Sequence, residues 1–167
     1  MNHLWAYFWP VLTAGLLIGG IGGLFAFRKR PRRAAILAGG LALSLAWAGL
    51  WHGPLGAADR FTTPIERQAR ESLNYYEVPE IKAKLHRGPL TRRLILSGDH
   101  LDDWQKGELA RLFSQLPGVS GATWSVKDAG LPLMAEASLV AIAGFLAGLL
   151  LAYLIELRRR YNAQWTW

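Results

Sequence analysis

The stretch Arg28-Lys29-Arg30-Pro31-Arg32-Arg33 decides how this chain is organised, because it places five cations and a proline between two long apolar runs. Residues 4–27 before it and residues 34–51 after it carry no charged side chain. A third run, residues 133–155, contains a single charge, Glu136. Each run is close to the roughly 20 residues that a helix needs to cross a hydrocarbon core about 30 Å thick. The sequence therefore predicts three transmembrane helices.

The net charge of the chain comes from two basic clusters. The sequence has 19 Lys and Arg against 12 Asp and Glu, a formal charge of +7 that raises the question of nucleic-acid binding. Residues 53–132, however, hold 11 cations and 10 anions, so the rest of the excess lies beside the apolar runs. The clusters consist of Arg28, Lys29, Arg30, Arg32, Arg33, Arg158, Arg159 and Arg160. Their position predicts a topological role and contact with anionic lipid, and no nucleic-acid partner.

The positive-inside rule orients the predicted helices. With both basic clusters in the cytoplasm, the N-terminus and the long middle segment lie outside, in the periplasm if the membrane is a bacterial inner membrane; a mitochondrial or other membrane is the alternative. The absence of cysteine excludes disulfides and thiolate metal sites. The predicted segments are helices at about 4–27 and 34–52 joined by a cytoplasmic turn at 28–33, a periplasmic domain with linkers at 53–132, a third helix at 133–157, and a cytoplasmic basic and aromatic tail at 158–167.

Small residues recur at a spacing of four in the apolar runs. Such residues let two helix backbones approach closely, and in lipid this packing supplies the attraction between helices. They predict a packing face, which is either internal to the three helices or, most notably on the first helix, a surface for a different membrane protein. The residues concerned are Gly15, Gly19 and Gly23 in the first run and Gly144, Gly148 and Ala152 in the third.

In the segment between the second and third runs, the spacing of apolar residues changes from helical to alternating. This change predicts a small domain that contains both helices and strands. Apolar residues at 65, 69 and 73 fit one face of a helix, and alternation at 81–86 fits a strand that is buried on one side. An apolar stripe that includes Trp104 predicts a second helix. The expected elements are a helix from Thr62 or Thr63 to about Asn74, strands at 81–86, 92–97 and within 119–126, and between the last two a helix that starts near Asp102.

Three short motifs in this segment resemble the BON domain, a small module of bacterial envelope proteins. They are Leu94-Ile95-Leu96-Ser97-Gly98, Asp102-Asp103-Trp104-Gln105 and Leu116-Pro117-Gly118-Val119, within residues 61–127. The resemblance implies an αββαβ fold, attachment to lipids or to partner proteins, and no catalytic residues. Such modules often occur in tandem or beside a peptidoglycan-binding domain, whereas here a single copy stands between membrane helices.

Arginines around the predicted hairpin form a local basic strip. Arg87, Arg92 and Arg93 lie there together with Lys82 and Lys84. Charges on an edge strand ordinarily remain in solvent and prevent sheet-to-sheet aggregation. The alternative is a periplasmic contact with anionic headgroups or with an acidic subunit.

Two groups of residues have side chains that can bind a metal or a cofactor. Asp99, His100, Asp102 and Asp103 are spaced to hold a divalent ion, but acids at a helix start also satisfy free backbone N–H groups. His3 and His52 fall near the outer interface, where a haem iron or a chlorophyll magnesium is conceivable, and they are assigned structural or solvated roles. The sequence predicts no metal, no cofactor and no catalysis, and leaves open whether pigment or lipid fills the grooves between helices.

The predicted fold class is an α-helical membrane protein with three transmembrane helices and a small αββαβ extramembrane domain between helices two and three. The predicted function is that of a non-catalytic accessory or scaffold subunit. It would pack on other integral membrane subunits of a larger inner-membrane complex, respiratory or photosynthetic, while its periplasmic domain docks on them. The alternative is an envelope-maintenance protein whose BON-like domain binds phospholipid or peptidoglycan.

Overall fold

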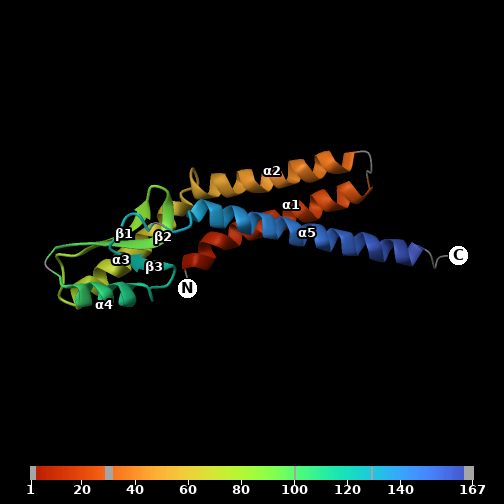
Figure 1. Ribbon diagram of the computed structural model, residues 1–167. Coiled ribbons are helices and arrows are strands. Elements are labelled where there is room, and N and C mark those ends of the chain that lie inside the picture. Colours follow the sequence, from red (N-terminus) through yellow and green to blue (C-terminus); the bar gives the residue numbers. More distant parts are fainter. Residues whose placement is uncertain (1–2, 29–31, 100, 129, 164–167) are drawn as a thin grey trace. The chain divides into compact units, whose positions relative to one another are not determined.

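The computed structural model describes residues 3–28, 32–99, 101–128 and 130–163 (Figure 1). Within these ranges the chain forms five α-helices and three β-strands. In chain order they are α1 (His3–Arg28), α2 (Arg33–His52), α3 (Ala57–Tyr75), β1 (Lys82–Arg87), β2 (Leu90–Ser97), α4 (Asp103–Phe113), β3 (Gly121–Thr123) and α5 (Leu133–Ala163).

The chain divides into two compact units. The helical unit comprises the described residues of Phe8–Leu55 and Ala137–Trp167. The domain unit comprises those of Met1–Tyr7 and Gly56–Glu136. The first turn of α1 and the first turn of α5 therefore belong to the same unit as the sheet, so the domain unit extends beyond the segment between α2 and α5.

Three helices are long and apolar enough to cross a membrane: α1 with 26 residues, α2 with 20 and α5 with 31. This confirms the three predicted apolar helices, and the bounds of α1 and α2 agree with the prediction to within a residue. The prediction for the end of α5 was wrong, because the helix continues through Arg158, Arg159 and Arg160 to Ala163 instead of ending at residue 157. The remaining tail, residues 164–167, lies outside the described residues.

Charge pairing explains why α5 continues. Glu156 lies one turn before two arginines, and its carboxylate oxygens are 3.6 Å from Arg159 Nε and 3.2 Å from Arg160 Nε. Glutamate followed by arginine at spacings of three and four stabilises a helix, and arginine itself is a good helix former. The cations that were expected to end the helix are instead part of it.

The domain unit contains a three-stranded sheet in the order β1-β2-β3. β1 pairs with β2 antiparallel, with Leu85 opposite Leu94, and β2 pairs with β3 parallel. The predicted order helix, strand, strand, helix, strand is confirmed between α2 and α5. The core is formed by one face of each helix and by inward strand residues: Phe61, Ile65, Ala69, Leu73, Leu85, Leu94, Leu96, Leu109 and Phe113 are all buried.

Helix α3 begins earlier than predicted. It starts at Ala57 after Gly56, whose φ of 69° suits glycine, so Pro64 lies inside the helix and not in its first turn. A proline at this position removes one hydrogen bond to the preceding turn. The apolar face compensates, because Ala57 and Phe61 continue the buried spacing of Ile65 towards the N-terminus.

The third strand is shorter than predicted, since β3 spans only Gly121–Thr123. Trp124 then turns its indole Nε1 to donate a hydrogen bond to the Lys106 carbonyl at 2.9 Å, and Val126 is exposed. The Trp104 side chain, which was predicted to be in the buried stripe of α4, is 76% exposed. That part of the prediction was wrong.

A capping box starts α4. The Asp102 carboxylate accepts a hydrogen bond from the Gln105 amide at 2.9 Å, and the Gln105 side chain accepts one from the Asp102 amide at 3.2 Å. Two backbone N–H groups that the helix itself cannot satisfy are therefore paired. This arrangement gives Asp102 a structural role.

We expect Asp102→Ala to lower the free energy of unfolding by about 1 kcal/mol, as loss of an N-cap carboxylate commonly does. Asp103→Ala is the matched control, because Asp103 is also in the first turn but accepts no capping bond, and it should cost less than half as much. Hydrogen exchange at the Gln105 amide measures both. Equal protection in the two variants would contradict the assignment.

Candidate functional site

The small residues of α1 and α5 face each other within the helical unit. A Cβ added at Gly15 would lie 2.6 Å from the Ala141 carbonyl oxygen, and one at Gly19 would overlap the backbone of Phe145. From the other side, a Cβ at Gly148 would lie 2.6 Å from the Gly20 amide nitrogen. The two helices run parallel in this contact, since residue numbers increase together along it. Backbones this close require glycine.

The small residues of α1 and those of α5 therefore form the two sides of one interface. Gly23 completes it on α1, because an added Cβ would be 2.7 Å from the Ala152 Cβ, and Gly144 completes it on α5, where an added Cβ would overlap the Leu12 carbonyl. Ala152 is buried. In the structure, the α1 face that carries Gly15, Gly19 and Gly23 is covered by α5, as the internal-packing interpretation expects.

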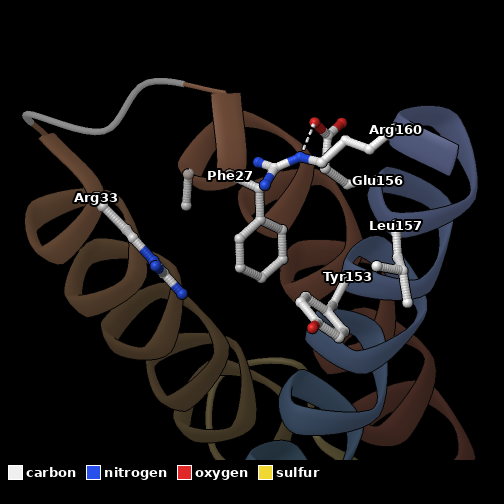
Figure 2. Close-up of a pocket in the computed structure, with 7 residues that line it drawn as sticks. Phe27, Arg33, Tyr153, Glu156, Leu157 and Arg160 are labelled. Carbon is white, nitrogen blue, oxygen red and sulfur yellow. Dashed lines mark hydrogen bonds and ion pairs between the residues drawn. The ribbon is translucent and has the colours of Figure 1, made fainter. Parts of the chain in front are cut away.

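The two basic clusters meet at one end of the helical unit. Arg33, at the start of α2, stacks its guanidinium over the Phe27 ring at 5.0 Å from the ring centre. Arg33 and Arg160 of α5 line one cavity of about 410 Å³ (Figure 2). Arg28, Arg32, Arg158 and Arg159 are exposed at the neighbouring helix ends, whereas Lys29 and Arg30 lie outside the described residues. Segments far apart in the sequence thus place their cations together.

Near the other end of the helical unit, a hydrogen bond joins α1 and α2. The Trp47 indole Nε1 of α2 donates a hydrogen bond to the Pro10 carbonyl of α1 at 3.3 Å. A helix carbonyl has two lone pairs, so Pro10 can accept this bond within an intact helix, and the Thr13 hydroxyl also donates to it. A Cβ added at Gly40 would lie 3.7 Å from Ile18. Because Trp47 also bonds to Pro10, α2 runs antiparallel to α1.

The arginines of the predicted basic strip are engaged in ion pairs inside the domain unit. Arg87 Nη2 lies 3.1 Å from Glu66 Oε2, and Arg92 Nε lies 2.7 Å from Glu136 Oε2. Arg93 Nη1 donates to the Asp128 carbonyl at 3.1 Å. Each guanidinium ties the hairpin to another element, so the strip is much less positive than its sequence suggests.

Exposed aromatic side chains are the surface feature of the domain unit that the sequence interpretation missed. Tyr75, the last residue of α3, is 82% exposed and makes an edge contact with Tyr76 at 5.5 Å between ring centres. Trp104, in the first turn of α4, is also exposed. The signal was present in the sequence, because Trp104 lies nine residues from Phe113, about two and a half helical turns, and so points to the opposite face.

Among the residues that the structure describes, the acids and histidines offered by the sequence form no metal-binding cluster. No group of three His, Cys, Asp or Glu side chains that could hold a metal ion occurs in the part of the chain that the structure describes. Asp102 serves the α4 cap, and His100 lies outside that part. His3 is at the start of α1 and His52 at the end of α2.

No family model, curated protein or solved structure matches the chain.

Proposed function

We propose that the protein is a multi-pass protein of a bacterial inner membrane, with its N-terminus and domain unit in the periplasm and its basic clusters in the cytoplasm. The meeting of Arg33 and Arg160 at one end of the helices supports this orientation, because the positive-inside rule then acts on both clusters in the same direction. Apolar side chains exposed along the outer faces support contact with lipid. They include Leu17, Ile21 and Phe25 of α1, Leu43 and Leu50 of α2, and Leu139, Leu146, Leu150 and Leu154 of α5.

We further propose that the chain is a non-catalytic accessory subunit whose domain unit, a BON-like module, docks on partner subunits of a larger membrane complex. The observation that carries this proposal is the exposure of Tyr75 and Trp104. Tyrosine and tryptophan are the residues that most often dominate the binding energy of protein interfaces. The small-residue face of α1 is covered, and the hairpin arginines are paired internally, so the exposed aromatics are the best remaining docking surface.

The combined variant Tyr75→Ala and Trp104→Ala should detach the protein from its complex. We expect the affinity to fall by tenfold or more, since truncating an interface aromatic commonly costs over about 1 kcal/mol. Blue-native electrophoresis of the full chain, extracted in mild detergent, measures this as loss of the high-mass band. Neighbouring subunits are identified by mass spectrometry of that band.

The control is Arg70→Ala with Val126→Ala, which alters two exposed side chains of the same unit that are not aromatic. This variant should keep the high-mass band. Migration of the wild-type protein as a lone monomer would refute the accessory-subunit proposal. Retention of the band by the aromatic variant would place the docking surface elsewhere. Binding of the full chain to peptidoglycan would instead favour the envelope-maintenance alternative.

A further inference from the structure

A cavity at the basic end of the helical unit combines two guanidinium groups with apolar walls. Its volume is about 410 Å³, within the range of small-ligand sites. Three helices contribute: Ala26 and Phe27 from α1, Arg33 from α2, and Tyr153, Glu156, Leu157 and Arg160 from α5. In Figure 2 the Arg33 and Arg160 side chains extend from different helices towards the space around the Phe27 ring.

The charges around this cavity are not balanced. Glu156 is buried, and its carboxylate is shared by Arg159 and Arg160. Arg33 forms no ion pair with any residue that the structure describes, and its nearest aromatic neighbour is Phe27. Three guanidinium groups against one carboxylate leave an excess of two positive charges. An anion from outside the chain would complete the site.

The donors available suit a phosphate. Arg160 uses Nε to bond Glu156, which leaves its terminal nitrogens to bind oxygen atoms, and stacking of Arg33 on Phe27 leaves the edge of its guanidinium accessible. Planar guanidinium groups match the spacing of phosphate oxygens. Arg33 is also the first residue of α2, and the preceding Arg32 makes no side-chain cap, so the positive end of that helix adds to the field.

The walls indicate that the phosphate carries acyl chains. Phe27 and Tyr153 meet edge to face at 5.8 Å between ring centres and form an apolar floor beside the cations. Leu157 continues this surface, and Leu154 and Leu150 lie exposed one and two turns earlier on α5. In the proposed membrane setting these leucines lie beside acyl chains, so the cations of the cavity and the apolar surface next to them match the two parts of one phospholipid, its phosphate and its chains.

We propose that this cavity binds the phosphate of one anionic glycerophospholipid, with Arg33 and Arg160 on the phosphate and the acyl chains along Leu157 and the exposed leucines of α5. This inference rests on the proposed membrane insertion of the helical unit. It assigns the basic clusters a specific ligand site in addition to their topological role.

The test is a lipid titration of the purified, delipidated full chain in mild detergent, followed by native mass spectrometry. The probes are phosphatidylglycerol, zwitterionic phosphatidylcholine and inorganic phosphate. We expect one phosphatidylglycerol to bind per chain, roughly tenfold more tightly than phosphatidylcholine, because anionic headgroups are favoured by basic pockets between helices. Arg33→Gln with Arg160→Gln should remove this preference.

Two further variants separate binding from folding. Arg158→Gln removes an exposed cation of the same turn that does not line the cavity, and it should leave the affinity within about twofold of wild type. Leu157→Glu places a carboxylate on the cavity wall, keeps both arginines, and should weaken phosphatidylglycerol binding about tenfold. Melting curves identify any variant that fails to fold. If the double arginine variant or Leu157→Glu does not fold, the other of these two tests the proposal.

Unchanged phosphatidylglycerol binding in a folded Arg33→Gln and Arg160→Gln variant or in a folded Leu157→Glu variant would overturn the proposal. Equal binding of phosphatidylcholine by the wild-type chain would also overturn it. Competition by inorganic phosphate at comparable concentration would also overturn it, by assigning the cavity to a free ion. Alkaline carbonate extraction distinguishes this failure from failure of the proposed function. A chain that stays in the membrane but shows no lipid preference refutes only the lipid site, whereas a chain released by carbonate refutes membrane insertion itself.

Discussion

Replacing Gly19 by leucine is expected to break the packing of α1 on α5 and to lower the free energy of unfolding by about 3 kcal/mol or more, at the upper end of the effect of overpacking a core. A Cβ alone at this position would come within 2.9 Å of the Phe145 Cα and overlap its carbonyl. Backbone atoms cannot rotate away as side chains can, so the helices must separate. Separation at Gly19 also loosens the contacts at Gly15 and Gly23.

Gly22→Leu is the matched control for this prediction. Gly22 lies on the same helix, and a Cβ added there meets nothing within 4 Å. It makes the same chemical change, and in isolation leucine favours helix formation over glycine. We expect its melting temperature in mild detergent, followed by circular dichroism, to equal that of wild type or exceed it. A similar loss of stability in both variants would show that the effect is not one of helix packing.

Arg92→Ala is expected to be the most damaging change among the ion pairs of the domain unit. The Arg92 side chain on β2 is 22% exposed and that of Glu136 is 18% exposed, with 2.7 Å between Nε and Oε2. Removing one partner of a buried ion pair costs about 3–5 kcal/mol, and partial exposure here reduces the expected cost to about 2 kcal/mol. Most of this cost comes from leaving the Glu136 carboxylate poorly solvated.

A double-mutant cycle with Glu136→Gln isolates the interaction. If the carboxylate is the partner, the second change should recover part of the stability lost in Arg92→Ala, and the two changes should not be additive. Chemical unfolding of the full chain is the measurement. The full chain is required because Glu136 lies in the first turn of α5 and Tyr7 of α1 packs on Phe61 at 5.6 Å between ring centres. Additive effects would contradict the pairing.

The pair Glu108 and Arg111 provides the comparison. It is a bidentate contact within α4 on an exposed face, and the hydrogen bond from Arg111 lowers the pKa of the Glu108 carboxyl. Water screens such exposed pairs, so Arg111→Ala should change stability by less than the error of the measurement. A loss equal to that of Arg92→Ala would mean that burial does not determine the strength of these pairs.

The three long apolar helices could be predicted because one physical requirement governs them. An uncharged run of about 20 residues specifies a spanning helix whatever its neighbours are. The end of α5 could not be found in this way, because it depends on pairing between Glu156 and the arginines that follow. A run of cations begins at Arg28, the last residue of α1, whereas the run that begins at Arg158 lies inside α5.

The domain unit was predictable in its order of elements and less so in its details. The alternation of apolar and polar residues at 81–86 predicted β1. The helical spacing of apolar residues predicted the buried face of α3 from Ile65 onwards. Trp104 was predicted to lie on the buried face of α4, but its position in the helical period places it on the exposed face. The early start of α3 depends on the burial of Phe61, which is a tertiary effect that local propensity does not contain.

The candidate sites depended most on tertiary contacts. The small residues that include Gly15 and Gly144 were predicted to form packing faces. The sequence alone could not determine that these two faces pack against each other. Likewise, the pairing of Arg92 with Glu136 joins segments that only the fold brings together. The predicted topology places both basic clusters on one side, but the cavity that Arg33 and Arg160 line depends on how α1, α2 and α5 pack together.

The parallel contact between α1 and α5 also sets the order of events during biosynthesis. The glycines of α1 are translated first, and the surface that covers them is translated only after α2 and the whole αββαβ segment. While the ribosome completes that segment, the nascent α1 helix has a smooth, uncovered face. The packing of α1 on α5 can therefore form only after the domain segment has been translated.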